Sequence, residues 1–351
     1  MTFPEPSAAS AALPESFPDI EALEEFMTRP DPDLVADLEA VPGDILVLGA
    51  GGKMGPTLCR MAKRAAPGKR VVAVARFTEP GLAERLRSQD VETLVCDLLD
   101  EEAVARLPKL ENVIYMAGRK FGSAGAEALT WAMNVLVPGR IASHFRESRI
   151  VAFSTACVYP YVPVILGGAG EETPTEPPVG DYAWSCVGRE RAFLFGSERW
   201  GTPGRLIRLC YAIDMRYGVL HDIATRVRAG EPVDLAMGHV NVIWQGDANA
   251  MALRSLRHVT SPTSALNVTG PELLSVRRLA GEFARLFGCE ARFRGEETGS
   301  AWLCDAARAF ELFGYPRVPL RRLVRWQADW IARGMPSLGK PTRFEVRDGH
   351  Y

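Results

Sequence analysis

The stretch that decides the fold is ILVLGAGGKMG, residues 45–55. It opens with an apolar run and continues into glycines, which is the pattern of a strand that is buried on both faces of a parallel sheet and ends in a tight turn. The segment that follows, TLCRMAKRAA (57–66), has the pattern of a helix. A strand, a glycine turn and a helix in this order are expected to form the first unit of an α/β fold.

The glycine turn is also the first candidate binding site. Glycines let a pyrophosphate approach the backbone N–H groups at a helix N-terminus, where the helix dipole favours negative charge. A turn that serves only packing is the alternative, but its place between a buried strand and a helix favours a bound dinucleotide. The residues expected to contact this cofactor are Gly49, Gly51, Gly52, Lys53, Met54 and Gly55.

Outward from this unit, strands alternate with helices. Further strands are expected at 71–76, 91–100, 112–118 and 149–155, and helices at 81–88, 101–108 and 126–148, the last with a proline interruption. Five consecutive strands joined in this way predict an α/β fold with a Rossmann-type, doubly wound parallel sheet. After about residue 200 the order is less regular, with strands expected at 204–210 and 265–270 and helices at 216–230, 246–258, 275–288 and 320–334.

These patterns divide the chain into five parts. They are a disordered segment 1–18, a helical extension 19–43, a cofactor-binding Rossmann domain 44–210, a smaller and mainly substrate-binding part 211–335 with some segments returning to the Rossmann core, and a loop-like tail 336–351. The two short helical patterns at 20–27 and 33–41 either pack on the main domain or form an interface with another protein, and both options stay open.

Composition excludes several functional classes. Of the 351 residues, 41 are Lys or Arg and 43 are Asp or Glu, so the net charge of −2 argues against a basic nucleic-acid binder or a polybasic membrane binder. The seven cysteines form no CxxC pair and are expected to be reduced thiols of a cytoplasmic protein. The five scattered histidines predict no metal site. The start MTFPEPSAAS is not a signal peptide, and prolines and glycines interrupt the uncharged stretch 150–170, so no membrane segment is expected.

The end of the second strand bears on the choice of dinucleotide. NAD sites usually place a carboxylate there for the ribose 2′-hydroxyl, whereas an arginine suits the 2′-phosphate of NADP. This chain has Ala75 and then Arg76, with Glu79 three residues further on. The cofactor is therefore expected to be NADP or NAD, with NADP favoured; the alternative role for Arg76 is that of a solvated surface residue.

Several motifs in one order carry a family resemblance. Besides 45–55 they include CDLLD (96–100), NVIYMAGRK (112–120), AMNV (132–135), RIVAFSTACVYP (149–160) and DYAWSCVGRE (181–190). Over about residues 44–335 the chain resembles the extended short-chain dehydrogenase/reductase superfamily, specifically its NAD(P)-dependent epimerase/dehydratase family. The resemblance implies an enzyme that transfers a hydride on a sugar-nucleotide-like or other small carbonyl or hydroxyl substrate. It also implies a homodimer formed through the helices that hold Asn134 and Tyr182.

The resemblance assigns roles residue by residue. Thr155 would bind the substrate oxygen and Tyr182 would be the acid/base. The implied cofactor contacts are Asp97 and Leu98 at the adenine, Met116, Ala117 and Gly118 at the strand end beneath the cofactor, Lys120 facing cofactor or substrate, and Asn134 on the cofactor side of the site. The alternatives are a surface lysine at 120 and, for Asn134, a polar residue near the helix break at Pro138.

The chain departs from the family pattern Tyr-x-x-x-Lys. Cys186 stands where the lysine would hold the nicotinamide ribose and lower the pKa of the tyrosine. Without that charge a phenol titrates at about 10 and is a poor base at neutral pH. Arg189 lies on the same helical face and would compensate for the missing charge if its side chain folded back toward Tyr182. The favoured alternative is a surface cluster with Glu190 and Arg191. With no histidine near it in the sequence, Cys186 is expected to be a small buried residue of the helix rather than a nucleophile.

Two rival functions follow. One is a catalytically weak or inactive nucleotide-binding regulator or scaffold that retained the cleft. The other is a structural interaction protein that uses residues 20–41. We expect residues 160–180 and 210–245 to line the substrate pocket, and sugars, polyols and aromatic ketones all remain open as substrates. The tryptophans expected mainly in the core or at an interface are Trp184, Trp200, Trp244, Trp326 and Trp330.

Overall fold

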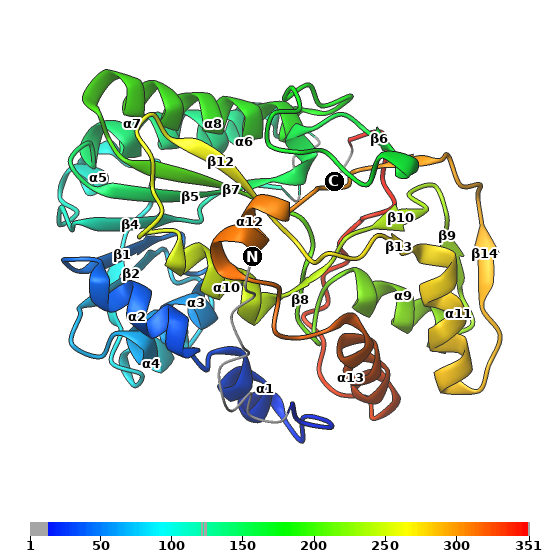
Figure 1. Cartoon of the computed structure of the whole chain (residues 1–351). Helices are drawn as coiled ribbons and strands as arrows, with labels where there is room; N and C mark the ends of the chain where they lie inside the picture. Colours follow the sequence, from blue (N-terminus) through cyan, green and yellow to red (C-terminus); the bar gives the residue numbers. More distant parts are fainter. Residues whose placement is uncertain (1–12, 121, 123–124, 350–351) are drawn as a thin grey trace, which may run out of the picture.

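The computed structural model of the chain describes residues 13–120, 122 and 125–349. At its centre lies one seven-stranded sheet in the order β12-β7-β5-β4-β1-β2-β3, and every pairing within it is parallel (Figure 1). The strands are β1 (Ile45–Leu48), β2 (Val71–Ala75), β3 (Glu92–Val95), β4 (Asn112–Tyr115), β5 (Arg149–Thr155), β7 (Gly204–Leu209) and β12 (Ser264–Val268). The order reverses at β1, so the prediction of a doubly wound Rossmann-type sheet is confirmed.

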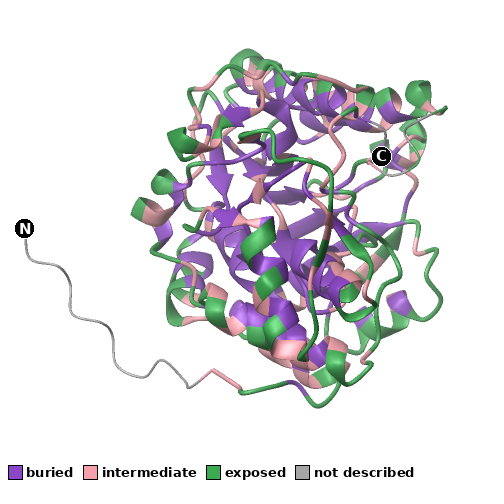
Figure 2. Cartoon of the chain, turned by 90° about the vertical axis from the view of Figure 1, so that its right-hand side faces the viewer, coloured by how far each residue is buried: buried purple, intermediate pink, exposed green. Residues whose placement is uncertain are grey.

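Helices cover both faces of the sheet because every central strand is apolar on both faces. One layer contains α2 (Pro32–Ala40), α3 (Gly55–Ala65), α4 (Leu82–Arg87), α10 (Gln245–Arg254) and α12 (Ala307–Phe313). The other contains α5 (Glu101–Ala105), α7 (Val137–His144) and α8 (Asp181–Trp200). Alternate residues of β1 serve the two layers, with Ile45 and Val47 facing one and Leu46 and Leu48 the other. Figure 2 shows the strands buried and the outer sides of the helices exposed.

The helical segment expected at 126–148 is divided in three. It consists of α6 (Glu127–Trp131), a π-helical turn (Ala132–Leu136) and α7. Pro138 lies in the first turn of α7 and has no N–H to donate to the carbonyl of Asn134 four residues earlier, which explains the wider turn at this point. The π-helical turn carries Asn134 at its centre and buries it completely.

The smaller part consists of α9 (Val219–Arg228), α11 (Val276–Phe287) and α13 (Leu320–Ala332) with short two-stranded pairings. The strands of these pairings are β6 (Val162–Pro163), β8 (Ala212–Ile213), β9 (Pro232–Asp234), β10 (His239–Val240), β11 (Ile243–Trp244), β13 (Leu274–Ser275), β14 (Arg292–Arg294) and β15 (Ser300–Ala301). Between them the chain returns to the Rossmann core three times, as α10 packed on α2 and α3, as β12 paired with β7, and as α12 packed on β12.

The N-terminal extension packs on the main body. Leu23 and Met27 of α1 (Ile20–Met27) are fully buried. Most of the segment expected to be disordered, residues 1–12, lies outside the described residues. For Phe17 the expectation is wrong: its side chain is 2% exposed and its ring contacts those of Trp244 and Trp326. An aromatic ring that fits between two tryptophans offsets the cost of ordering this short stretch.

The tail forms neither helix nor strand over 336–349, yet it is not a free loop. Thr342 and Phe344 are buried, and Tyr161 donates a hydrogen bond to the carbonyl of Arg347. Within the described part of the chain, none of the helices is long and apolar enough to cross a membrane.

Candidate active site

Two adjoining cavities lie at the carboxyl ends of the parallel strands, where ligands bind in open α/β sheets. The larger, about 970 Å³, follows the glycine turn after β1 and is called the groove. The smaller, about 220 Å³, lies beyond the end of β5 and is called the pocket. Lys53, Met54 and Tyr217 line both, so the two cavities meet at these side chains.

The floor of the groove is bare backbone. Gly49 has a φ of +86°, and a Cβ there would lie 2.5 Å from the amide nitrogen of Ala117. A Cβ at Gly55 would collide with the carbonyl of Ala50. These two glycines are therefore required by packing. At Gly52, in contrast, a Cβ would meet nothing closer than 3.5 Å, so its missing side chain leaves open space along the groove.

The start of α3 faces this open floor. The helix has 11 residues, begins at Gly55 and carries no acidic residue in its first turn. The positive end of its dipole therefore borders the groove, although the amide of Gly55 already donates to the carbonyl of Gly52 and Pro56 has no N–H. This arrangement fits a diphosphate, and the residues present would hold a dinucleotide there.

Lys53 leaves the turn and reaches the junction of the two cavities. Its Nζ donates to the carbonyl of Ala212 at 3.3 Å and lies 4.1 Å from the centre of the Tyr217 ring. Burial lowers the pKa of the ammonium to about 8, although Asp214 opposes the shift. Because it lines both cavities, Lys53 can meet the anionic part of a cofactor or of a substrate.

Two segments that the sequence analysis did not connect with the site wall the groove. Ile20, Glu21 and Glu24 of α1 line it on one side, and Leu338 and Lys340 of the tail line it as well. Neither segment has a motif that points to a ligand, so only tertiary contacts reveal this role.

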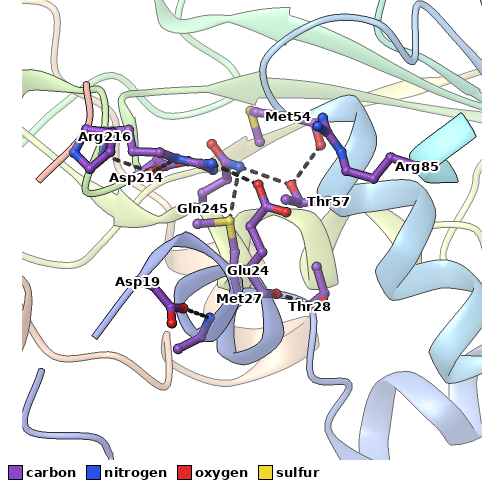
Figure 3. A network of polar contacts seen from close by, with 12 residues as sticks. Asp19, Glu24, Met27, Thr28, Met54, Thr57, Arg85, Asp214, Arg216 and Gln245 are labelled. Atoms are coloured by element: carbon purple, nitrogen blue, oxygen red, sulfur yellow. Dashed lines mark hydrogen bonds and ion pairs between the residues drawn. The ribbon is translucent and has the colours of Figure 1, made fainter. Parts of the chain in front are cut away.

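Helix α1 is held at the groove by ionic contacts. Arg216 donates to Glu24 at 2.8 Å and to Asp214 at 2.7 Å (Figure 3). On the opposite side Glu25 accepts from Arg60 at 2.8 Å and from Arg64 at 2.6 Å, both on α3. The extension is thereby fixed to both sides of the groove.

The end of the groove beyond β2 differs from the expectation. Among the described residues its wall here comprises Glu79, Arg85 and Gln89, and Arg85 pairs with Glu79 at 3.3 Å. Arg76 is exposed just beyond β2 and is not part of that wall.

Asp97 and Leu98 also lie outside the wall of the groove. The Asp97 carboxylate accepts from the amide of Leu99 at 3.0 Å, and Leu98 is buried in the core. Sequence reasoning missed Arg85, a cation in the helix after Arg76.

At the end of β4, Met116 lines the groove and Ala117 packs beneath Gly49. Asn134 lies below them without touching either cavity. Its Oδ1 accepts from the Arg119 amide at 2.9 Å and from Arg189 at 2.6 Å. Its Nδ2 donates to Ser185 at 2.9 Å and to the Arg119 carbonyl at 3.0 Å. Its hydrogen bonds thus join the loop after β4 to α8.

The pocket brings together the two residues expected to be catalytic. Thr155 ends β5 and Tyr182 lies in the first turn of α8, and both line the pocket. Burial raises the pKa of Tyr182 well above its usual value, while the charge of Arg189 and a hydrogen bond with Thr155 lower it. At neutral pH the phenol is therefore a proton donor.

Lys120 reaches the same pocket from the loop after β4. Its Nζ lies 5.8 Å from the centre of the Tyr182 ring and 3.4 Å from the carbonyl of Thr342 in the tail. Burial lowers its pKa. The structure thus places Lys120 inside the site and not on the surface.

Cys186 is completely buried one turn after Tyr182, and burial raises the pKa of its thiol to about 11. It is therefore a neutral residue, as expected for a small helix position. No group of His, Cys, Asp and Glu within the described residues could hold a metal ion.

The expectation for Arg189 is wrong. The residue is 6% exposed and lies beneath Gly118, where a Cβ would collide with the guanidinium. Besides Asn134 it donates to the Phe153 carbonyl at 3.0 Å. Its neighbour Glu190 is buried too, in an ion pair of 2.7 Å with Arg208. The Arg-Glu pair thus belongs to the inner face of α8, which the sequence pattern did not distinguish from a charged surface.

The lining of the pocket matches one of the two predicted segments. Tyr211, Tyr217 and Val219 belong to the range 210–245. Among the described residues that line it, none comes from 160–180, and Trp302 and Thr342 line it from outside both predicted segments.

Comparisons with known proteins bear on the family and the fold. Residues 45–216 match the NAD dependent epimerase/dehydratase family, and no curated protein sequence matches the chain. Similar solved structures include a UDP-glucose 4-epimerase from Thermotoga maritima and a UDP-glucuronic acid 4-epimerase from Bacillus cereus. Each has 17% identity, a TM-score of 0.69 and coverage of 83% of this chain and 99% of the other. A dTDP-glucose 4,6-dehydratase from Streptomyces venezuelae has 18% identity, a TM-score of 0.71 and coverage of 83% and 98%. At these identities they support the fold.

Proposed function

Because residues 45–216 of this chain belong to the NAD-dependent epimerase/dehydratase family of enzymes, we propose that the protein is an NAD(P)-dependent oxidoreductase or epimerase. Its substrate is sugar-nucleotide-like or another small carbonyl or hydroxyl compound. The single observation that carries this proposal is that Thr155 and Tyr182 share a pocket which meets the glycine-floored groove at Lys53.

The residues divide the chemistry between them. A nicotinamide bound in the groove supplies the hydride donor or acceptor. Thr155 and Tyr182 bind the oxygen of the reacting carbon, and Tyr182 gives its proton to that oxygen when a carbonyl is reduced. In the reverse direction the substrate hydroxyl loses its proton to the phenolate and its carbon loses a hydride, which leaves a carbonyl. Because burial favours the protonated phenol, reduction is the direction that needs less assistance.

The preference for NADP over NAD is part of the proposal. Arg76 directly follows β2 but lies outside the wall of the groove, whereas Arg85 on α4 lines it. A guanidinium binds a phosphate in a bidentate way, so Arg85 is the residue that supports a 2′-phosphate. Several structural neighbours were solved with NAD, and they share at most 22% identity with this chain. Calorimetry with NADPH and NADH, on the natural protein and on Arg85→Ala, measures the preference directly.

A homodimer is proposed as well. Exposed apolar side chains gather on α6, the π-helical turn and α8: Leu129, Trp131, Leu136, Trp184 and Phe195. Covering such a face stabilises an oligomer. Sedimentation should give a dimer for the natural protein and a monomer for Leu136→Glu. The cytoplasm is the proposed compartment, since the cysteines of the described residues are free thiols.

Turnover tests the central proposal. The protein is given NADP(H) and NAD(H) with a panel of nucleotide sugars and small ketones, and absorbance at the nicotinamide band and epimerised product are followed. Tyr182→Phe should lose about a thousandfold or more of the rate, within the range that acid–base catalysis contributes. Tyr315→Phe, which alters an exposed ring far from the pocket, should leave the rate unchanged.

A second candidate function rests on Cys186. A neutral thiol one turn after Tyr182 favours a protein that binds the dinucleotide and turns over slowly or not at all. Stoichiometric binding of NADPH without any product across the panel would select this regulator or scaffold over the enzyme. Absence of binding would refute both.

A further inference from the structure

We propose that Lys120 supplies the positive charge that stabilises the ionised form of Tyr182, acting across the pocket from the loop after β4. Lys120 is a positioning residue in this role, since it acts through the phenol. The inference rests on the proposed function and names the group that makes the phenol usable in both directions of proton transfer.

The first argument is geometric. Tyr182 lies on α8 and Lys120 follows β4, so the two side chains enter the pocket from different elements. The Lys120 ammonium is 5.8 Å from the centre of the Tyr182 ring, within the range where a cation interacts with an aromatic face. The loop that carries Lys120 is fixed by Asn134, which accepts from the amide of Arg119 and donates to its carbonyl.

The second argument is electrostatic. A buried phenol ionises only with difficulty, and a cation within several ångströms in a cavity of low dielectric constant reverses part of that cost. Burial also lowers the pKa of Lys120, so an adjacent phenolate would stabilise its charged form in return. Each group thus offsets the other's burial.

Arg189 also lowers the pKa of Tyr182 through its charge, but from beneath the pocket. Its guanidinium donates to Phe153 and Asn134 and does not line the pocket among the described residues, so its contribution is present whether or not Lys120 is replaced. Lys53 interacts with Tyr217 and Ala212 at the far junction.

The ionisable groups that face the pair come from every neighbouring element. They are Cys157 after β5, Cys186 and Arg189 on α8, Cys210 after β7, and Asp222 on α9. Burial raises the pKa of Cys186 to about 11, and that of Asp222 also rises, although Thr342 hydrogen-bonds its carboxylate. Several ionisable groups therefore contribute to any pH profile of the pocket, so the profile is interpreted by comparing variants with the natural protein.

The test measures the phenol itself. A fluorinated tyrosine is placed at position 182, where its ionisation falls at lower pH than that of tyrosine, and the ¹⁹F signal is followed against pH in the cofactor-free protein. Replacing Lys120 by Met should raise the pKa of this phenol by about one to three units. Lys120→Arg should keep most of the effect. Lys340→Met, which removes a lysine from the groove only, should leave the pKa unchanged.

Moving the charge provides a second variant. In the Lys120→Met protein, Cys186→Lys introduces an ammonium from α8 one turn after Tyr182, and the pKa of the phenol should fall again. An unchanged pKa in folded Lys120→Met, shown by circular dichroism, would overturn the inference. If Lys120→Met does not fold, two other variants test the inference. Lys120→Arg should keep most of the effect on the phenol pKa, and Cys186→Lys alone should lower that pKa little because a cation is already present.

This readout is independent of turnover. A protein with no activity but with the expected pKa shifts would refute the proposed function and support the role of Lys120. An active protein in which Lys120→Met leaves the pKa of the Tyr182 phenol unchanged would support the proposed function and refute the role of Lys120. In an active protein, Lys120→Met should lower kcat for alcohol oxidation at least tenfold at pH 7, with a smaller loss at higher pH and little change in cofactor affinity.

Discussion

The groove and the pocket differ in the chemical groups that they present to a ligand. The groove presents backbone: Gly51 and Gly52 contribute no side chains, and the N-terminus of α3 contributes the positive end of its dipole. The pocket presents ionisable side chains, and burial moves the pKa of both Lys120 and Tyr182 away from solution values. A backbone site is therefore predictable from local spacing, whereas the behaviour of the pocket depends on what several elements bring to it.

The largest expected effect is on cofactor affinity, and it distinguishes the role of the groove from that of the pocket. Gly52→Val adds a side chain where a Cβ has at least 3.5 Å of clearance, so the fold should survive while the floor of the groove is filled. NADPH affinity measured by calorimetry should fall by a factor of about 100 or more, which is about 2.7 kcal/mol. The phenol pKa at position 182 should stay unchanged.

Gly68→Val is the matched control, because a Cβ there meets nothing within 4 Å and the residue is remote from both cavities. Equal affinity loss in both variants would mean that the open floor is not where the cofactor lies.

The next largest effect is expected on stability, at Lys53, where the groove and the pocket meet. The folded-state pKa of Lys53, about 8, lies below the unfolded value of about 10.4, so the charged amine opposes folding at pH 8 and below. This penalty is relieved as the pH rises from about 8 to about 10.4. Lys53→Met should therefore raise the free energy of unfolding at pH 7 by about 1–2 kcal/mol, since partial exposure reduces the full penalty.

Denaturant titration at pH 7 and pH 9.5 checks the sign for Lys53. The gap between natural protein and variant should shrink at the higher pH. A gap of the same size at both values, or one that Lys340→Met reproduces, would contradict a buried charge at the junction.

The smallest effect concerns the wall of the groove. Glu24→Gln removes the ion pair with Arg216, which is partly buried, and should cost about 0.5–1 kcal/mol of stability. Cofactor release, followed by rapid-mixing displacement, should become a few times faster because α1 is held less firmly. Glu21→Gln alters the neighbouring groove-lining carboxylate, which has no ion pair among the described residues, and should leave the release rate as it was.

Much of the fold was open to prediction. Apolar runs such as 45–48 and 71–75 indicate strands that are buried on both faces. Because these strands alternate with helices, they predict a parallel sheet that is covered by helices on both sides. Thr155 and Tyr182 were proposed from the family resemblance, and the structure brings them into one pocket.

What escaped prediction depends on contacts between distant segments. A buried Arg189 looks like a surface residue until the π-helical turn brings the Asn134 oxygen to 2.6 Å from it. Trp302 and Thr342, which replace the expected 160–180 lining, carry no local pattern that points to a ligand. The same holds for α1, whose pairing with Arg216 spans most of the Rossmann domain in sequence.

Helix α1 has a consequence for how the molecule is made. It is synthesised before the Rossmann domain, and its partners Arg60 and Arg64 on α3 follow soon after it. Its other partners, Arg216, Trp244 and Trp326, are translated after most or nearly all of the chain. During synthesis, domains form from the N-terminal end as they emerge. The glycine turn and strands β1 to β5 can therefore form while α1 is held only by its ion pairs with α3, before the residues that complete its attachment have been synthesised.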